Sequence, residues 1–255
     1  MTSVHQLLNL PWFWLGVCLR LLFITVCVQL AAVNWYVPFF EATFFTTLDD
    51  PWTVWTATDG ALEAFPYGYV MWLAFGPLFA LQSLLKIEGA WFYFGTLLAF
   101  ELFLFFCLSQ LAGQKQHLLA SLYWLSPIAL VPAYAYGFND IVPAAMLMGA
   151  VYAVRRRYWK SAGFIMALAV SAKLSMLVAV PILLLYFLNK ASVRYALPTT
   201  AASFMLTVAF CNFPFVMSDR AVEFVMLNSE MAALGKHVVS LADAELILPP
   251  LAYDV

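Results

Sequence analysis

Long apolar stretches alternate with short polar turns along most of this chain. A transmembrane helix needs about 20 consecutive apolar residues, because the hydrocarbon core of a membrane is ~30 Å thick. The pattern therefore predicts an all-α, polytopic transmembrane helix bundle with about seven apolar segments. These segments cover residues 12–33, 68–85, 91–111, 118–136, 138–154, 161–188 and 195–215.

Two longer stretches interrupt this pattern, at residues 34–67 and 216–255. We expect each of them to form an outer loop. No repeat of 20–50 residues and no low-complexity segment divides the sequence. We therefore expect residues 1–255 to form a single transmembrane domain.

The composition agrees with a membrane protein. Hydrophobic residues make up 65% of the chain and charged residues only 10%, whereas soluble domains carry about 25% charged residues. The mean hydropathy is +0.88. We expect a multi-pass protein of the plasma or inner membrane or of the endoplasmic reticulum, with membrane lipid as a partner and no role for nucleic acid. The four cysteines show no spacing typical of disulfides or zinc sites.

The positions of lysine and arginine predict the orientation, because cytoplasmic loops are enriched in both. No Lys or Arg occurs between Leu21 and Leu85, a region that holds five acidic residues, whereas 155–160 and 190–194 are basic. We expect the two basic turns in the cytoplasm. The loops 34–67 and 216–255 would then share the outer compartment.

Segment 161–188 begins and ends beside basic turns, so both of its ends are predicted to be cytoplasmic. One straight helix cannot return to the side on which it started. Two short helices that meet at Lys173 on the outer side would solve this and would keep the lysine out of hydrocarbon. The same reasoning requires a partial span somewhere in 68–136, or a count of segments that is off by one.

Ionisable residues inside apolar segments are informative, because each costs at least ~2.5–3.5 kcal/mol at the centre of a membrane. Arg20, Glu101 and Lys173 lie inside such segments, and Asp140 lies at the boundary of one. Arg20 either pairs with Glu101 or a backbone carbonyl, or it contacts a substrate. Lys173 is either an interfacial lysine that extends toward water or a binding residue.

The first outer loop carries candidate chemistry in the run Asp49-Asp50-Pro51-Trp52. Adjacent carboxylates raise each other's pKa and can hold a cation or take a proton from a hydroxyl. Trp52 suits a membrane interface or the face of a sugar. Asp-Asp-Pro is also an ordinary solvated turn, so the loop gains weight only together with Lys173 and Asn139-Asp140, which the predicted topology brings to the same face.

The order of these features resembles the GT-C superfamily of membrane glycosyltransferases, and in particular the GPI mannosyltransferases and their bacterial relatives. The likeness covers about residues 10–215. The outer-loop acids Asp49 and Asp50 depart from the Asp-X-Asp of the GPI enzymes, which leaves the use of a divalent cation open. The elements that carry the resemblance after them are Phe65-Pro66-Tyr67-Gly68-Tyr69, Ser126-Pro127-Ile128, Tyr136-Gly137-Phe138-Asn139-Asp140, the basic turn 155–160, and Ala162-Gly163 through Lys173 with Pro181 beyond it.

The resemblance implies a hexosyltransferase that moves a sugar from a polyprenyl-phosphate donor to an acceptor on the outer or luminal face. Asp49 or Asp50 would take the proton from the acceptor hydroxyl, and Lys173 would stabilise the departing phosphate. Further substrate-binding candidates are Asn139, Asp140, Tyr67, Trp52 and Arg20.

Two other interpretations stay open. In a transporter or lipid flippase, Arg20, Glu101 and Lys173 would line a substrate path, although no second half of the chain mirrors the first. A non-catalytic membrane subunit would supply a lipid-facing surface to a partner in a glycosyltransferase complex. GT-C members usually continue through several more helices, so a truncated or split member is one reading of the length.

Overall fold

The computed structural model describes residues 10–44, 50–61, 64–113, 116–226, 238–241 and 244–247. This part of the chain is helical apart from one short antiparallel strand pair, in which Val238 faces Ile247. In chain order the elements are α2 (Pro11–Val26), the π-helical turn η1 (Ala32–Tyr36), α3 (Val37–Phe44), α4 (Pro51–Thr56), α5 (Tyr69–Phe79), α6 (Gln82–Leu85), α7 (Gly89–Ala112), α8 (Gln116–Leu119), the π-helical turn η3 (Ala120–Trp124), α9 (Pro127–Leu130), the π-helical turn η4 (Val131–Ala135), α10 (Ile141–Arg155), α11 (Trp159–Ala172), the 3-10 turn η5 (Leu174–Val178), α12 (Ala179–Asn189), α13 (Ala191–Arg194), α14 (Leu197–Asn212), the 3-10 turn η6 (Phe213–Met217), α15 (Asp219–Met226), β1 (Val238–Leu241) and β2 (Ala244–Ile247).

Prolines start several of these helices. Proline has no N–H to donate and a fixed φ, so it fits the first turn, where backbone N–H groups have no partner within the helix. Pro11, Pro51, Pro127 and Pro198 occupy the first or second position of α2, α4, α9 and α14. The sequence thus breaks long apolar runs into shorter helices at defined points.

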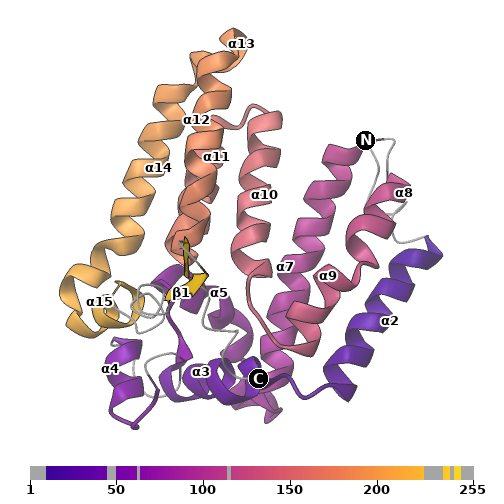
Figure 1. Ribbon diagram of the computed structural model, residues 1–255, viewed down its shortest axis with the longest axis vertical. Helices are drawn as coiled ribbons and strands as arrows, with labels where there is room; N and C mark the ends of the chain where they lie inside the picture. Colours follow the sequence, from indigo (N-terminus) through magenta and orange to yellow (C-terminus); the bar gives the residue numbers. More distant parts are fainter. Residues whose placement is uncertain are drawn as a thin grey trace.

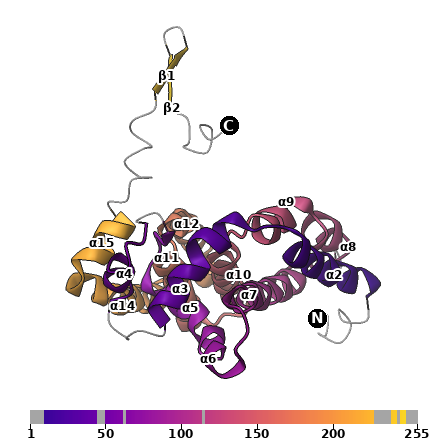
Figure 2. The same cartoon turned by 90° about the horizontal axis from the view of Figure 1, so that it is seen from below.

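Four helices form the main layer of the bundle. The views in Figures 1 and 2 show α7, α10, α11 and α14 side by side, and α11 packs against both α10 and α14. The connection between α10 and α11 lies at one end of this layer with α13, and the connection between α11 and α12 lies at the other (Figure 1). We call these the basic end, after Arg155–Arg157 and Lys190, and the Lys173 end.

The predicted all-helical class is confirmed for the described residues, whereas the seven-span count is not. Helix α7, with 24 residues, is the one described helix both long and apolar enough to cross a membrane. Five further apolar helices among the described residues have 10–17 residues each, which is too short for this criterion. They are α2, α5, α10, α11 and Leu174–Asn189.

Helix α5 explains the mismatch in the sequence-based topology. It has 11 residues, which gives a length of ~17 Å at 1.5 Å per residue, about half of the hydrocarbon thickness. Helix α7, which follows the short α6, begins beside α3, because a Cβ at Gly89 would meet the side chains of Glu41 and Val37. The chain therefore enters and leaves the α5–α6 region at the same end, which agrees with the partial span that the sequence requires in 68–136.

The break predicted at Lys173 is confirmed. Helix α11 ends at Ala172, Lys173 adopts an extended backbone conformation (φ −146°, ψ 119°), and α12 begins at Ala179. Pro181 lies in the first turn of α12, where its missing N–H leaves no gap in the hydrogen bonding. The two short helices leave Lys173 at the end of the bundle.

The stretch 34–67, predicted as a loop, is largely helical where it is described. Helices α3 and α4 pack against each other, and α3 also packs against α5 and α7 at the Lys173 end (Figure 2). Phe39, Phe40 and Phe65 are fully buried; Phe39 stacks on Phe65, and Phe40 meets Phe65 edge to face. Aromatic side chains bury a large area when they pack together, and the side chains of a solvated loop would stay exposed. The stretch therefore forms part of the core at this end.

The arrangement predicts opposite sidedness for the two ends. Thr58→Cys lies beyond α4 and Tyr158→Cys lies between α10 and α11, and both parent side chains are exposed. In a background with the four native cysteines replaced by alanine, a membrane-impermeant maleimide applied to intact vesicles should label one of the two variants and should label the other only after permeabilisation. Labelling of both from the same side would contradict the topology.

Candidate active site

The Lys173 end carries an ion pair between two helix termini. Lys173 is the residue after α11, and Asp140 is the residue before α10. The Nζ of Lys173 donates to Oδ1 of Asp140, and the two side chains remain 25% and 58% exposed. A pair this accessible can exchange partners, because the charges have not left water completely.

Tyr67 lies against this lysine. The Lys173 Nζ is 5.2 Å from the centroid of the Tyr67 ring, within the range of a cation–π interaction. The hydroxyl of Tyr67 lies 3.1 Å from that of Tyr36. Burial, followed by the charge and hydrogen bond of Tyr36, raises the pKa of Tyr67 well above its ordinary value. The phenol therefore stays protonated.

Gly68 brings the Tyr67 segment to the end of α11. The backbone N–H of Gly68 donates to the carbonyl of Ala172 at 3.3 Å. A Cβ at position 68 would lie 2.0 Å from the carbonyl oxygen of Ser171, which is shorter than any real contact. Only glycine permits this approach, and it fixes Tyr67 beside Lys173.

Asn139 has the least satisfied side chain at this end. Its side chain is fully buried, and neither its Oδ1 nor its Nδ2 has a hydrogen-bond partner among the described residues. Gly137 turns the chain into this position with φ +84°, and its carbonyl accepts from Tyr93 Oη at 2.6 Å. Because a buried unpaired amide costs about 1–3 kcal/mol, the arrangement favours a bound polar group or water at Asn139.

Asp50 is held on the other side of the Tyr67–Tyr69 segment. It is the N-cap of α4, where Oδ1 accepts from the backbone N–H of Trp52 at 3.2 Å and Oδ2 accepts from Thr53 Oγ1 at 2.7 Å. The hydroxyl of Ser218 also donates to Oδ2. Tyr69 interacts with the same carboxylate. Asp49, the other predicted base, lies outside the described residues.

Two of the predicted binding residues have structural roles. Trp52 is fully buried, and its Nε1 donates to the carbonyl of Phe65 at 3.0 Å, so it has no free face for a sugar. Arg20 is also fully buried, and its Nε and Nη2 each donate to Glu101 at 2.5 Å. Both residues thus have structural contacts, and Arg20 makes the pairing with Glu101 that the sequence left open.

The closed environment of Arg20 explains how a charge is tolerated there. Its Nη1 donates to the carbonyls of Gly16 and Trp124, and its guanidinium carbon lies 3.7 Å from the centroid of the Trp124 ring. Tyr134 Oη donates to Glu101 at 2.5 Å. Every charged group has close partners, as a buried ion pair requires.

An apolar cavity opens beside Asp140. It has a volume of about 200 Å³ and lies between α7, α9, η4 and α10. Ile128, Pro132, Phe138 and Ile141 are among the side chains that line it, with Asp140 as its one charged lining residue. An apolar cavity with a charged group in its lining can bind an amphiphile.

Nothing in the described ranges forms a cluster of three or more His, Cys, Asp or Glu side chains that could hold a metal ion. At the Lys173 end, Asp50 accepts a hydrogen bond from Ser218 and Asp140 pairs with Lys173.

Three contributing residues were not found from the sequence. Tyr36 and Tyr69 reach the site from η1 and α5, and Ser218 reaches Asp50 from beyond α14. Only Ser218 carried a signal, because serine often precedes a helix, and here its Oγ accepts from the backbone N–H of Ala221 at 2.9 Å.

A protein-family model with the description ALG3 protein matches residues 16–230. No curated protein and no solved structure matches the chain. The matched range contains Asp49, Asp50, Asn139, Asp140 and Lys173.

Proposed function

We propose that this chain, which belongs to the ALG3 protein family, is a membrane mannosyltransferase that uses a dolichyl-phosphate-linked donor at its Lys173 end. Membership of this family confirms the resemblance to GT-C glycosyltransferases. The observation that carries the proposal is the exposed ion pair of Lys173 and Asp140 beside the unpartnered Asn139.

Lys173 is the proposed contact of the donor phosphate. It is the one Lys or Arg between Lys160 and Lys190, and its helix break holds it at the end of the bundle rather than in hydrocarbon. A partly desolvated ammonium group stabilises negative charge on a leaving phosphate more than a fully hydrated ammonium group does. When the donor binds, the phosphate would share Lys173 with Asp140 or replace it.

Asn139 and Asp140 are the proposed contacts of the sugar. An amide can donate and accept, and a carboxylate can accept from two hydroxyls, so together they suit the vicinal hydroxyls of a hexose. The protonated Tyr67 hydroxyl is held by Tyr36, and we assign the Tyr67 ring to fixing the position of Lys173.

The apolar cavity beside Asp140 is the proposed site of the first isoprene units. Asp140, the residue that pairs with Lys173, is part of its lining, so a lipid chain in the cavity would place its phosphate near the lysine. Its volume of about 200 Å³ accommodates only a short part of a polyprenyl chain, and the remainder would extend into the membrane.

The general base is assigned to the Asp49–Asp50 pair. Asp50 already accepts hydrogen bonds from Trp52, Thr53 and Ser218, so both of its carboxylate oxygens are engaged by the protein. We therefore assign proton removal from the acceptor hydroxyl to Asp49. Asp50 would hold the start of α4 and so the position of its neighbour.

We assign the Lys173 end to the luminal face of a multi-pass protein of the endoplasmic reticulum. The support is the positive-inside rule, because Arg155–Arg157 and Lys190 occupy the opposite end. The transporter interpretation required Arg20, Glu101 and Lys173 to line one substrate path. Arg20 and Glu101 instead form a fully buried ion pair with each other, which argues against such a path.

The experiment that tests this function is Lys173→Met. A charged donor contact contributes ~1.5–3 kcal/mol, so we expect the affinity for dolichyl-phosphate-mannose to fall about ten- to a hundredfold, as ~1.4 kcal/mol is tenfold. Lys173→Arg should retain part of the affinity, because it keeps the charge. Donor binding and the thermal midpoint are measured on the same purified protein.

Lys86→Met is the matched control, because Lys86 is exposed and lies outside the proposed site. It should leave donor affinity unchanged. If Lys173→Met kept full donor affinity and raised the thermal midpoint, Lys173 would be an interfacial lysine with a desolvation cost and no part in donor binding.

A further inference from the structure

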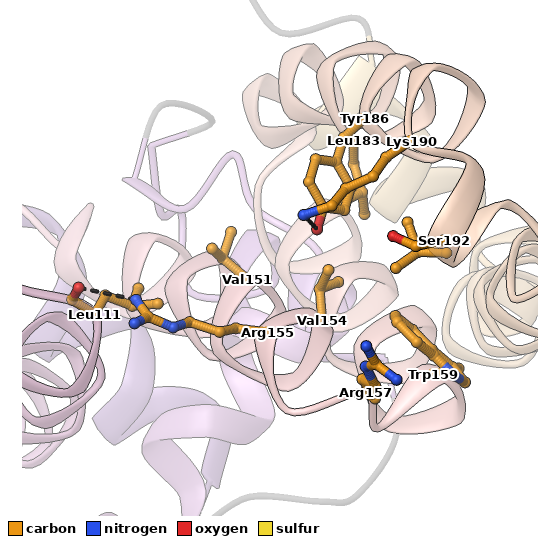
Figure 3. A pocket seen from close by; sticks show the side chains of 11 residues that line it. Leu111, Val151, Val154, Arg155, Arg157, Trp159, Leu183, Tyr186, Lys190 and Ser192 are labelled. Atoms are coloured by element: carbon orange, nitrogen blue, oxygen red, sulfur yellow. Dashed lines mark hydrogen bonds between the residues drawn. The ribbon is translucent and has the colours of Figure 1, made fainter. Parts of the chain in front are cut away.

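A second cavity lies at the basic end, away from the proposed active site. It has a volume of about 440 Å³ and is formed by the ends of α7, α10 and α12, the start of α11, and α13 (Figure 3). Its position at helix termini places it at the level of a membrane surface rather than in the hydrocarbon core.

Three cations line this cavity, and none of its lining residues is acidic. Arg155 reaches across to the carbonyl of Leu111, to which its Nη1 donates at 2.9 Å. The Nζ of Lys190 lies 3.5 Å from the hydroxyl of Tyr186, and Arg157 lies beside Trp159 (Figure 3). No ion pair to a carboxylate of the described residues neutralises any of the three.

These contacts leave donors for an anion. A guanidinium carries five N–H donors and an ammonium three, and the Leu111 carbonyl uses one of those of Arg155. Figure 3 shows Arg155, Lys190 and Arg157 on different sides of the same space. Cations that repel one another are brought together here without an acid, which is the electrostatic pattern of an anion site.

The rest of the lining is apolar. Val151, Val154 and Leu183 form its walls, and Trp159 and Tyr186 add aromatic faces. Trp and Tyr are typical of the membrane–water interface. A small hydrated anion would gain nothing from these walls, whereas a molecule with a phosphate and an attached apolar chain would use both parts of the lining.

We propose that this cavity binds an anionic phospholipid of the adjoining leaflet. Its phosphodiester would lie between Arg155 and Lys190, and the start of an acyl chain would lie against Val151 and Leu183. Basic pockets between helices at a membrane surface bind anionic headgroups in this way. The site is separate from donor binding and does not depend on the assignment of Lys173.

The test uses the full chain purified in detergent, with phosphatidylserine and phosphatidylcholine as probes and native mass spectrometry as the readout. Two surface cations contribute enough to make Arg155→Gln/Lys190→Gln bind phosphatidylserine about tenfold more weakly. Phosphatidylcholine has the same phosphodiester but no net charge, so it should bind the unmodified protein more weakly and should lose less in this variant. The thermal midpoint without lipid should stay unchanged, because both side chains are exposed.

Arg194→Gln is the matched control. Arg194 is exposed and lies on α13 at the same end, but it does not line the cavity. An equal loss of phosphatidylserine binding in this variant would mean attraction by the whole basic surface and would overturn the site. Displacement of the lipid by millimolar glycerol phosphate from the unmodified protein would also overturn it, in favour of a soluble phosphate ligand.

Discussion

Asp49→Asn is expected to lower mannose transfer by about 10²–10⁴-fold, the usual contribution of general base catalysis. Asparagine has nearly the size of aspartate but cannot take a proton from the acceptor hydroxyl. The measurement is single-turnover transfer from dolichyl-phosphate-mannose by the purified chain. Donor affinity should change little, because the proposed phosphate contact is Lys173.

Asp50→Asn tests the role of Asp50 separately from that of Asp49, the proposed base. Asparagine is as good an N-cap as aspartate, but its NH₂ group cannot accept from Thr53 and Ser218 as the Asp50 Oδ2 does. We expect a partial loss of activity with a lower thermal midpoint. Asp50→Ala removes the cap as well and should cost about 1 kcal/mol of stability.

Asp59→Asn is the control for both variants. Asp59 is exposed and has φ +56°, a left-handed conformation that asparagine also tolerates. The change removes one charge from the same stretch at no backbone cost, so activity should stay at the level of the unmodified protein. If Asp49→Asn, Asp50→Asn and the double variant all kept full turnover, the two carboxylates would form only a turn.

The break at Lys173 shows what the sequence can predict about this fold. Two basic turns require both ends of segment 161–188 on one side, which requires a break within it. The cost of a lysine in hydrocarbon places that break at Lys173. The same reasoning places Asn139 and Asp140 on the face of Lys173. The contact between Lys173 and Asp140 agrees with it, although no pattern in the sequence specified that pair.

Segment 68–85 shows where hydropathy fails. Residues 68–85 are predominantly apolar, but the hydropathy of a segment does not show where a helix ends within it. Helix α5 continues through Pro77, which removes a hydrogen bond to the preceding turn, and it stops at Phe79. The requirement for a partial span in 68–136 was therefore a better guide than the length of the segment.

Trp52, Asp50 and Ser218 show the part that needs tertiary structure. A tryptophan beside a polar turn suits a sugar as well as a core, and only the packing of Phe39 and Phe65 around Trp52 decides between them. Ser218 is 168 positions from Asp50. Contacts at such separation leave no local signal in the residue pattern.

Glu101→Leu is expected to destabilise the protein by about 3–5 kcal/mol, because it leaves the guanidinium of Arg20 buried without its counter-ion. Both side chains are fully buried, so neither can reach water when its partner is removed. Arg20→Leu should have a similar effect through the unpaired carboxylate. The measurement is the free energy of unfolding in detergent, followed by the tryptophan fluorescence of the purified chain.

The double variant Arg20→Leu/Glu101→Leu decides what this pair does. Replacing a buried ion pair by apolar residues is often neutral, because the desolvation cost of both charges disappears, so we expect it to recover most of the stability lost in either single variant. The exposed pair of Arg220 and Glu223 is the control, and Arg220→Leu should cost no more than about 1 kcal/mol. If the double variant were as unstable as Glu101→Leu, the hydrogen bonds from Arg20 to Gly16 and Trp124 would be the essential contacts. A loss of mannose transfer by Arg20→Leu at unchanged stability would return Arg20 to the list of substrate contacts.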